Sequence, residues 1–330
     1  MSTYYENGHN LPISVAAWLA LDLYKANPDI ISATQIMKST RKLILGNAIA
    51  QDSTLVAKPV DVMSLLKSRK GTAVHTALEL TWTNDEYRHK ALSALGYSQA
   101  SIDKFIVNGD PAKLKKGQIP VYTERFCSRP LGDYEVGGTA DFIIKGVLTD
   151  YKNTSTYSYM DKTKDKMYQL QGSIYRWAMP DIVTEDVMDI VETYDDWSAG
   201  QSYRNGYPPQ PVMVKKIPLM NMKATERFLS TKIQEIEKHM GLPINELPFC
   251  SDEDLWRKGD TYKYYKNPTA TGRSTNNFDT YLDAQKKHRE DGSVGRIDIV
   301  KGKAVACRYC EAINICNQAK ILIGSGDLVL

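Results

Sequence analysis

Two aspartates and a lysine, Asp141, Asp150 and Lys152, have the types and spacing of residues that could hold a divalent cation. Between the aspartates, Ile144-Lys-Gly-Val147 has the form of a two-residue hairpin loop, in which Gly146 can adopt a positive φ. Such a turn places Asp141 directly opposite Asp150, with their Cβ atoms roughly 4.5–5.5 Å apart. Because side chains alternate along a strand, Lys152 then projects from the same sheet face as Asp150.

The chemistry of this group follows from its charges. Like charges that face each other on a sheet are destabilising, so the two carboxylates need either a shared proton or a cation between their oxygens. Mg²⁺ prefers oxygen ligands, and a lysine on the same face could contact a phosphate or a water bound to the ion. An ordinary alternative stays open at this point, because the three residues could also form an ion-pair ladder on an exposed sheet face.

Hydrophobic periodicity predicts the elements that carry these residues. Residues rich in β-branched and aromatic side chains predict strands at 119–126, 134–144, 147–151, 183–194 and 211–218. Helical spacing predicts helices at 166–179, at 222–240 and across 71–103, where Asn84 and Gly96 interrupt the pattern. Residues 1–70 are predicted to be mainly helical, with a capping box at Ser32-Ala-Thr-Gln35.

Composition limits the class of protein. The 330 residues are 42% hydrophobic and 25% charged, which is ordinary for a globular chain, and the net charge of +3 does not demand a polyanionic partner. The apolar stretch Ile13–Leu21 is too short to span a bilayer and lacks a basic leader, so we expect a cytoplasmic protein with no membrane partner. No phosphate-binding loop, zinc-protease motif, hydrolase nucleophile motif or dinucleotide fingerprint is present.

Two further pairs of polar residues are spaced as i,i+4 neighbours on predicted helices, His75 with Glu79 and Gln171 with Tyr175. Gly138-Thr-Ala-Asp141 followed by Asp150-Tyr-Lys152 resembles the core of the PD-(D/E)XK nuclease superfamily. Gly71-Thr-Ala-Val-His75-Thr-Ala-Leu-Glu79 resembles the helix that supplies a metal-binding histidine in the RecB-type branch, and Gln171-Gly-Ser-Ile-Tyr175 resembles the Q-x-x-x-Y motif of that branch.

The resemblance implies an α/β fold with a restriction-endonuclease-like core, a small mixed sheet flanked by helices. It also implies three regions: a helical N-terminal region at 1–70, the nuclease core at 71–246, and a cysteine-containing C-terminal region at 247–330 that packs on the core.

Three cysteines lie close together as Cys307-Arg-Tyr-Cys310-Glu-Ala-Ile-Asn-Ile-Cys316, a spacing that favours a metal site over secreted disulfides. This C-x2-C-x5-C motif resembles the C-terminal cluster of RecB/AddB-type and CRISPR-associated exonucleases, in which four cysteines hold a [4Fe–4S] cluster. The candidates for the fourth ligand here are Cys127 and Cys250. Cys250 is favoured because its surroundings resemble a segment of phage-encoded nucleases. Structural Zn²⁺ remains the alternative occupant.

The resemblance assigns roles to the site residues. His75, Asp141, Asp150 and the carbonyl of Tyr151 would hold one or two Mg²⁺ or Mn²⁺ ions. These ions would polarise the phosphate of the substrate and lower the pKa of a bound water. Lys152 would orient that water, and Gln171 and Tyr175 would hydrogen-bond the substrate backbone. Glu79 or Glu124 could orient the metal ligands.

The sequence therefore predicts a divalent-metal-dependent deoxyribonuclease. The resemblance favours an exonuclease of DNA recombination, repair or replication, of a phage-encoded type that would act in the host cytoplasm. Its partners would be DNA and a recombinase, helicase or single-strand-binding protein. The alternative function is a catalytically silent nucleic-acid-binding or recombination-accessory module on the same fold. Cleavage mode, polarity and strand preference stay open.

The C-terminal region from Leu247 is rich in Tyr, Lys, Asn and Asp and shows little periodic apolar pattern before the cysteine motif, so we expect it to depend on the cysteine cluster for its order. Within it, Lys258 and the run Tyr262-Lys-Tyr-Tyr-Lys266 interleave aromatic and basic side chains, as surfaces that bind single-stranded nucleic acid do. An equally good interpretation is a solvated loop that anchors its tyrosines in the core.

Overall fold

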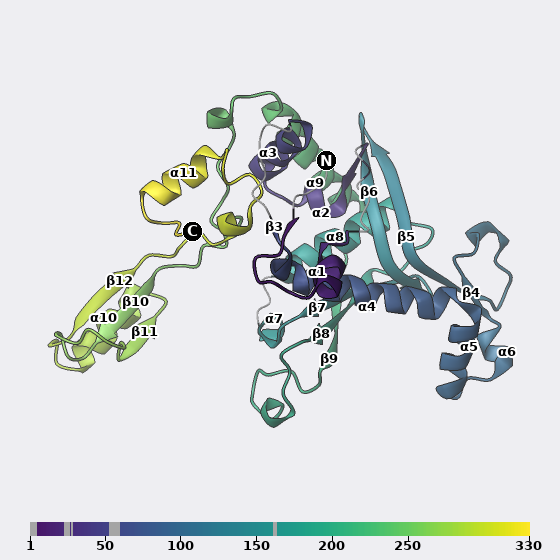
Figure 1. The fold of residues 1–330 in the computed structure, drawn as a ribbon, viewed down its shortest axis with the longest axis horizontal. Coiled ribbons are helices and arrows are strands. Elements are labelled where there is room, and N and C mark those ends of the chain that lie inside the picture. The colour runs from purple at the N-terminus through teal and green to yellow at the C-terminus, as the bar shows by residue number, and fades with distance from the viewer. Residues whose placement is uncertain (1–4, 23–26, 28, 53–59, 161–163) are drawn as a thin grey trace. The chain divides into compact units, whose positions relative to one another are not determined.

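The computed structural model describes residues 5–22, 27, 29–52, 60–160 and 164–330 (Figure 1). The chain divides into two compact units. One, which we call the sheet unit, contains Ser2–Met37 and Pro59–Gln234, and the other, the cysteine unit, contains Lys38–Lys58 and Glu235–Leu330. The boundaries expected at residues 70 and 246 remain a prediction, although Lys38–Lys58 belongs with the C-terminal residues in this division.

The sheet unit is built on one mixed β-sheet. Its strands run in the order β4 (Phe105–Val107), β5 (Ile119–Leu131), β6 (Tyr134–Ile144), β7 (Val147–Thr154), β8 (Val187–Tyr194) and β9 (Val212–Pro218), and β2 (Ile30–Ser32) pairs with β6. The pairs β4–β5, β2–β6 and β7–β8 are parallel, whereas β5–β6, β6–β7 and β8–β9 are antiparallel. The two longest strands, β5 and β6, curve side by side (Figure 1).

Helices flank this sheet. They are α1 (Ile13–Ala20), α2 (Ala33–Ile36), α4 (Leu66–Thr83), α5 (Asp85–Ala94), α6 (Gln99–Ile102), α7 (Thr156–Met160), α8 (Asp165–Ala178) and α9 (Met222–His239). Asn84 separates α4 from α5 and caps α5 by accepting a hydrogen bond from the Tyr87 amide, and the capping box of Ser32 and Gln35 starts α2. The mixed α/β, restriction-endonuclease-like fold class is thus confirmed. Within the described residues, no helix is both long and apolar enough to cross a membrane.

The core of the sheet unit depends on close approach between α8 and the sheet. Along β8, Met188, Ile190, Glu192 and Tyr194 alternate inward and are buried. Gly172 lets α8 pack at short range, since a Cβ there would lie 2.3 Å from Met188 Sδ. Ile174 and Trp177 of α8 are almost fully buried in the same core.

The cysteine unit contains α3 (Thr40–Gln51), β10 (Thr261–Tyr265), β11 (Asn276–Phe278), α10 (Tyr281–Glu290), β12 (Arg296–Val300) and α11 (Asn317–Gly324). The strands form an antiparallel sheet in the order β11-β10-β12, and α10 packs against all three (Figure 1). Three short strands and a helix thus precede the cysteine motif, in a stretch whose sequence shows little periodic apolar pattern. These strands have only three to five residues each, which is too short for a periodic pattern to be clear in the sequence.

A glycine at position 137 is required where β6 meets β5. A Cβ at Gly137 would lie 2.0 Å from the Cys127 carbonyl oxygen, a backbone atom that cannot move aside cheaply. We predict that Gly137→Ala lowers the free energy of unfolding by about 1–3 kcal/mol, as overpacking does. Gly71→Ala on α4 is the matched control, because nothing lies within 4 Å of its Cβ position. Chemical denaturation of both variants tests this, and equal stabilities would contradict it.

Candidate metal centre

The hairpin between β6 and β7 positions the two central aspartates. Lys145 and Gly146 both have positive φ, 50° and 80°, and Ile144 pairs with Val147 as the loop sequence predicts. The ladder continues to Phe142 opposite Thr149 and then stops. At the next step the Tyr151 amide donates a hydrogen bond to Asp141 Oδ2 at 2.9 Å, so the carboxylate takes the place of a backbone acceptor.

A compact set of possible metal ligands forms beside this hairpin. His75 on α4, Glu124 on β5 and Asp141 on β6 each offer one atom, and these atoms all lie within 4.8 Å of one another. His75 Nε2 lies 3.6 Å from Asp141 Oδ2 and 3.1 Å from the Tyr151 carbonyl oxygen, and its Nδ1 lies 3.6 Å from Glu124 Oε1. The helix packs against both β5 and β7, which brings the histidine to the strands.

Glu124 has an unusual backbone conformation at this point. Its φ is +46°, a region that non-glycine residues rarely occupy, and it interrupts the β5–β6 ladder between the pairs Thr123–Phe142 and Arg125–Ala140. Such strain tends to be retained at functional sites. Of the two glutamates considered from the sequence, only Glu124 has its carboxylate at the site, since none of the described hydrogen bonds or ion pairs joins Glu79 to these residues.

Asp150 and Lys152 form the other half of the site. Lys152 Nζ lies 2.6 Å from Asp150 Oδ2, as expected for side chains on one face of β7. On α8, Gln171 Nε2 donates to Asp150 Oδ1 and to the Tyr175 hydroxyl, both at 3.3 Å. Asp150 is only 1% exposed, and its Oδ2 is buried without a hydrogen bond of good geometry. The Asp150 carboxylate is thus buried as an ion pair with Lys152 and is oriented by Gln171.

A buried glutamate next to the lysine was not found from the sequence. Glu192 of β8 is paired with Lys152 in the parallel register and is 1% exposed. It accepts hydrogen bonds from the Tyr194 hydroxyl at 2.8 Å and the Ser158 hydroxyl at 3.4 Å, while Lys152 Nζ lies over the Tyr168 ring. The signal was available, because Glu192 is a polar residue at an inward position of an alternating strand.

The charges of the site perturb each other. The hydrogen bond to Glu124 and the charge of Asp141 raise the pKa of His75 to about 9 against the opposing effect of burial. Burial, followed by the charge of Asp150, raises the pKa of Asp141 to about 7 although His75 and Lys152 act in the other direction. The protein thus holds more carboxylate charge here than its own cations neutralise, which is the electrostatic condition for binding a metal ion.

The second cluster brings four cysteines together in the cysteine unit. Cys316 is buried in its apolar core, and Cys250, Cys307 and Cys310 pack against that core. Burial and the nearby thiols raise the pKa of Cys307 to about 11. Cys127 instead lies in the core of the sheet unit, where burial raises its pKa to about 11. The structure therefore groups Cys250 and not Cys127 with the three cysteines of the motif.

Polar side chains fix the backbone around these cysteines. Arg41 of α3 is 1% exposed, donates to the carbonyl oxygens of Leu247 and Pro248, and places Nη1 3.8 Å from Cys316 Sγ. Gln318 bonds both the amide and the carbonyl of Cys250, at 2.8 and 3.0 Å. The Arg41 guanidinium beside Cys316 Sγ would stabilise a thiolate there when a metal is bound.

Comparison with known proteins gives only remote similarity. No protein-family model and no curated protein matches the chain. Among solved structures, the chain is similar to that of SSO0001, with 14% identity and a TM-score of 0.38 over 73% of this chain and 92% of that chain. It is also similar to the alkaline exonuclease LHK-Exo from Laribacter hongkongensis, at 14% identity and a TM-score of 0.26 over 36% of this chain and 58% of that chain. For the complex of LHK-Exo with dAMP, the identity is 14% and the TM-score 0.35 over 68% and 92%.

The raised pKa values predict how pH and metal affect stability. Both groups bind protons more tightly in the folded state, Asp141 with a pKa of about 7 instead of 3.8 and His75 with about 9 instead of 6.5. Without a divalent ion, stability should therefore fall as the pH rises from about 4 to about 9. A bound Mn²⁺ displaces these protons, so Mn²⁺ should raise the melting temperature more at pH 8 than at pH 5.5.

Thermal melts with and without Mn²⁺ measure this effect, and Asp141→Asn is the variant in which the metal-dependent increase should be lost. An equal increase at both pH values, or an unchanged increase in the variant, would show that the ion binds elsewhere.

Proposed function

We propose that the chain is a divalent-metal-dependent nuclease that hydrolyses phosphodiester bonds in DNA. The observation that carries this proposal is the convergence of the His75, Glu124 and Asp141 ligand atoms within 4.8 Å, beside the buried Asp150–Lys152 pair. Hard oxygen ligands with one imidazole suit Mg²⁺ or Mn²⁺. Such an ion supplies Lewis-acid activation of the phosphate and of a water.

The chain's own residues would then act around the phosphate. Lys152 would donate hydrogen bonds from its ammonium group to the phosphate or to the attacking water. Its positive charge would offset the negative charge that develops on the phosphate during attack. Gln171 holds Asp150 Oδ1 in place and is itself bonded to Tyr175, so α8 fixes the orientation of that carboxylate. Glu124 would restrain the ring of His75 through Nδ1, leaving Nε2 toward the hairpin.

The finer assignment to an exonuclease of DNA recombination, repair or replication is part of the same proposal. Its support is the order of motifs along the chain: His75 before the hairpin, Asp141 and Asp150 on it, and the Gln171–Tyr175 pair after it, as in the RecB-type branch. The C-terminal cysteine motif belongs to the same resemblance. DNA is the proposed partner.

We further propose that Cys250, Cys307, Cys310 and Cys316 hold a [4Fe–4S] cluster with a structural role. Within the described part of the chain, no three of these sulfur atoms lie within 4.8 Å of one another. Tetrahedral zinc would need sulfurs about 3.8 Å apart, from a Zn–S length of roughly 2.3 Å. The preference for iron–sulfur over zinc rests on the resemblance of the C-x2-C-x5-C motif to the iron–sulfur nucleases, since four thiolates suit either metal centre.

Nuclease activity is predicted to depend on Asp150 and Lys152. Asp150→Asn and Lys152→Gln should each lower the rate of Mg²⁺-dependent DNA cleavage by at least about 10²–10³-fold, because the first removes a carboxylate that would hold the metal and the second removes the ammonium that would offset charge on the phosphate. The matched controls are Asp189→Asn and Lys216→Gln, which break the exposed Asp189–Lys216 ion pair on β8 and β9 of the same sheet. The controls should cleave at nearly the unchanged rate.

The measurement uses end-labelled linear DNA and closed circular DNA, with circular dichroism to confirm folding. An exonuclease degrades the linear DNA and leaves the circle intact, whereas nicking of the circle would make the enzyme an endonuclease. Cleavage that both Asp150→Asn and Lys152→Gln retain would refute the assigned site, whereas DNA binding without cleavage by the unchanged protein would favour a silent binding module.

The cysteine cluster predicts a coloured protein. Anaerobically purified protein should be brown, with visible absorbance and iron and sulfide at about four each per chain. Cys310→Ser should lose the colour and most of the solubility, since it removes a ligand from the cysteine unit. Cys127→Ala is the control, because this thiol lies in the other core, and it should keep the colour. A colourless protein with one zinc per chain would establish a zinc site instead.

A further inference from the structure

The small antiparallel sheet of the cysteine unit has two faces of different character. Along β10, Tyr262 and Tyr264 point to α10, where their rings contact Tyr281 and His288. Lys263 and Tyr265 alternate to the opposite face. Tyr264 is fully buried and Tyr265 is 8% exposed. Of the two interpretations of the tyrosine run, the stacking surface does not apply to Tyr264, whose buried ring anchors the sheet on the helix, although the run is a strand and not a loop.

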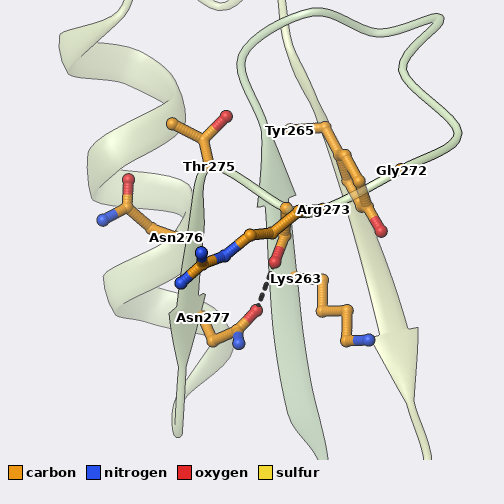
Figure 2. Close-up of a pocket in the computed structure, with 8 residues that line it drawn as sticks. Lys263, Tyr265, Gly272, Arg273, Thr275, Asn276 and Asn277 are labelled. Carbon is orange, nitrogen blue, oxygen red and sulfur yellow. Dashed lines mark hydrogen bonds between the residues drawn. The ribbon is translucent and has the colours of Figure 1, made fainter.

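A pocket of about 400 Å³ lies on the face away from α10 (Figure 2). Figure 2 shows the Arg273 side chain crossing in front of β11 while Lys263 and Tyr265 project from β10 on the same side. The residues that line the pocket include Lys263, Tyr265, Arg273, Ser274 and Asn277, and no carboxylate is among them. Its volume is at the lower end of the range for ligand pockets.

Lys263, Arg273 and Asn277 offer hydrogen-bond donors to this pocket. The Ser274 hydroxyl donates to Asn277 Oδ1 at 2.7 Å, which leaves the Asn277 amide nitrogen as the free end of that side chain (Figure 2). Among the described residues, neither Lys263 nor Arg273 has a carboxylate within ion-pairing distance. Asp298, which lies opposite Lys263 on β12, is bound by Arg296 Nε at 3.0 Å.

The wall of the pocket is held in place before any ligand binds. Arg296 spans the loop between β10 and β11 by donating to the carbonyl oxygens of Pro268 and Ala270, and its guanidinium stacks over the Tyr265 ring at 4.3 Å. The end of the loop is fixed by the Thr275 amide, which donates to the Tyr264 carbonyl at 2.8 Å. Preorganised donors lose less entropy on binding.

The net positive charge of the chain comes from the residues around this sheet. Residues 258–302 contain nine Lys and Arg against six Asp and Glu, whereas the remainder of the chain contains 33 of each. The segment is closed at its base, where Lys301 pairs with Asp260 at 3.1 Å and Gly302 lies against the Lys258 carbonyl. This closed segment, the basic module, thus carries the entire net charge of +3.

We propose that the pocket of the basic module binds the phosphodiester backbone of single-stranded nucleic acid, at one nucleotide residue. Two unpaired cations and an amide donor recognise phosphate oxygens, and the pocket is too small to admit a duplex but matches one unit of a flexible strand. The site belongs to the cysteine unit and uses no residue of the metal centre, so it is independent of the nuclease proposal.

The test is equilibrium binding of a fluorescein-labelled oligo-dT by the full-length protein in buffer without divalent cations, so that no cleavage is needed. Lys263→Gln/Arg273→Gln should weaken binding about tenfold and flatten its salt dependence by about 0.7 in slope for each phosphate that the protein no longer neutralises. Lys286→Gln/Arg289→Gln is the matched control, because it removes the same charge from exposed positions of α10 and should bind nearly as the unchanged protein does.

If both double variants bind equally more weakly, only the net charge of the protein matters and the pocket is not the binding site. Unchanged binding by both double variants would also refute the proposal. Competition by poly-glutamate as strong as by unlabelled oligo-dT would overturn nucleic acid as the ligand. Arg273→Gln alone changes only an exposed loop side chain, so its affinity reports on the pocket even if the double variant folds poorly.

Discussion

Asp141 and Asp150 lie within electrostatic reach of each other at a point of the sheet from which water is largely excluded. With Glu124 they crowd three carboxylates around one lysine and one histidine. Burying that much like charge is unfavourable unless protons or a cation compensate it. The surrounding fold holds the carboxylates against their repulsion through the tight hairpin, the strained Glu124 and the two helices that supply His75 and Gln171.

The same constraint explains why the neighbouring elements bury polar groups. Gln171 can hold Asp150 only because Gly172 brings α8 so close to Met188, and Tyr175 packs against Gly138 in the strand that carries Asp141. Glu192, Tyr194 and Ser158 form a satisfied network under the lysine face of β7. Such networks make the position of a charged side chain specific, although an apolar core of the same shape could be more stable.

The sequence predicted the hairpin because Lys145-Gly146 between two β-rich runs leaves one short loop, and that loop determines the register up to Phe142 and Thr149. The sequence could not show that the ladder stops there. The Tyr151 amide could donate to a backbone carbonyl or to the Asp141 carboxylate, and tertiary contacts decide which of the two accepts the hydrogen bond. The positive φ of Glu124 is likewise invisible in a run of ordinary strand residues. Glu192 could have been found by strand alternation. The grouping of Cys250 with the distant motif depends on chain topology, which spacing does not encode.

The apolar core of the cysteine unit also explains how the chain can contain the basic module as an insertion. Only 56 residues separate Cys250 from Cys307, and the module occupies most of them. Because both cysteines pack on one apolar core, the two ends of the insertion are brought together by groups outside it. The entropy of closing such a loop is then offset by the core and not by the module, whose own strands are short. A three-stranded sheet with polar edges can therefore stay ordered, and its open face is free to carry the net positive charge of the chain.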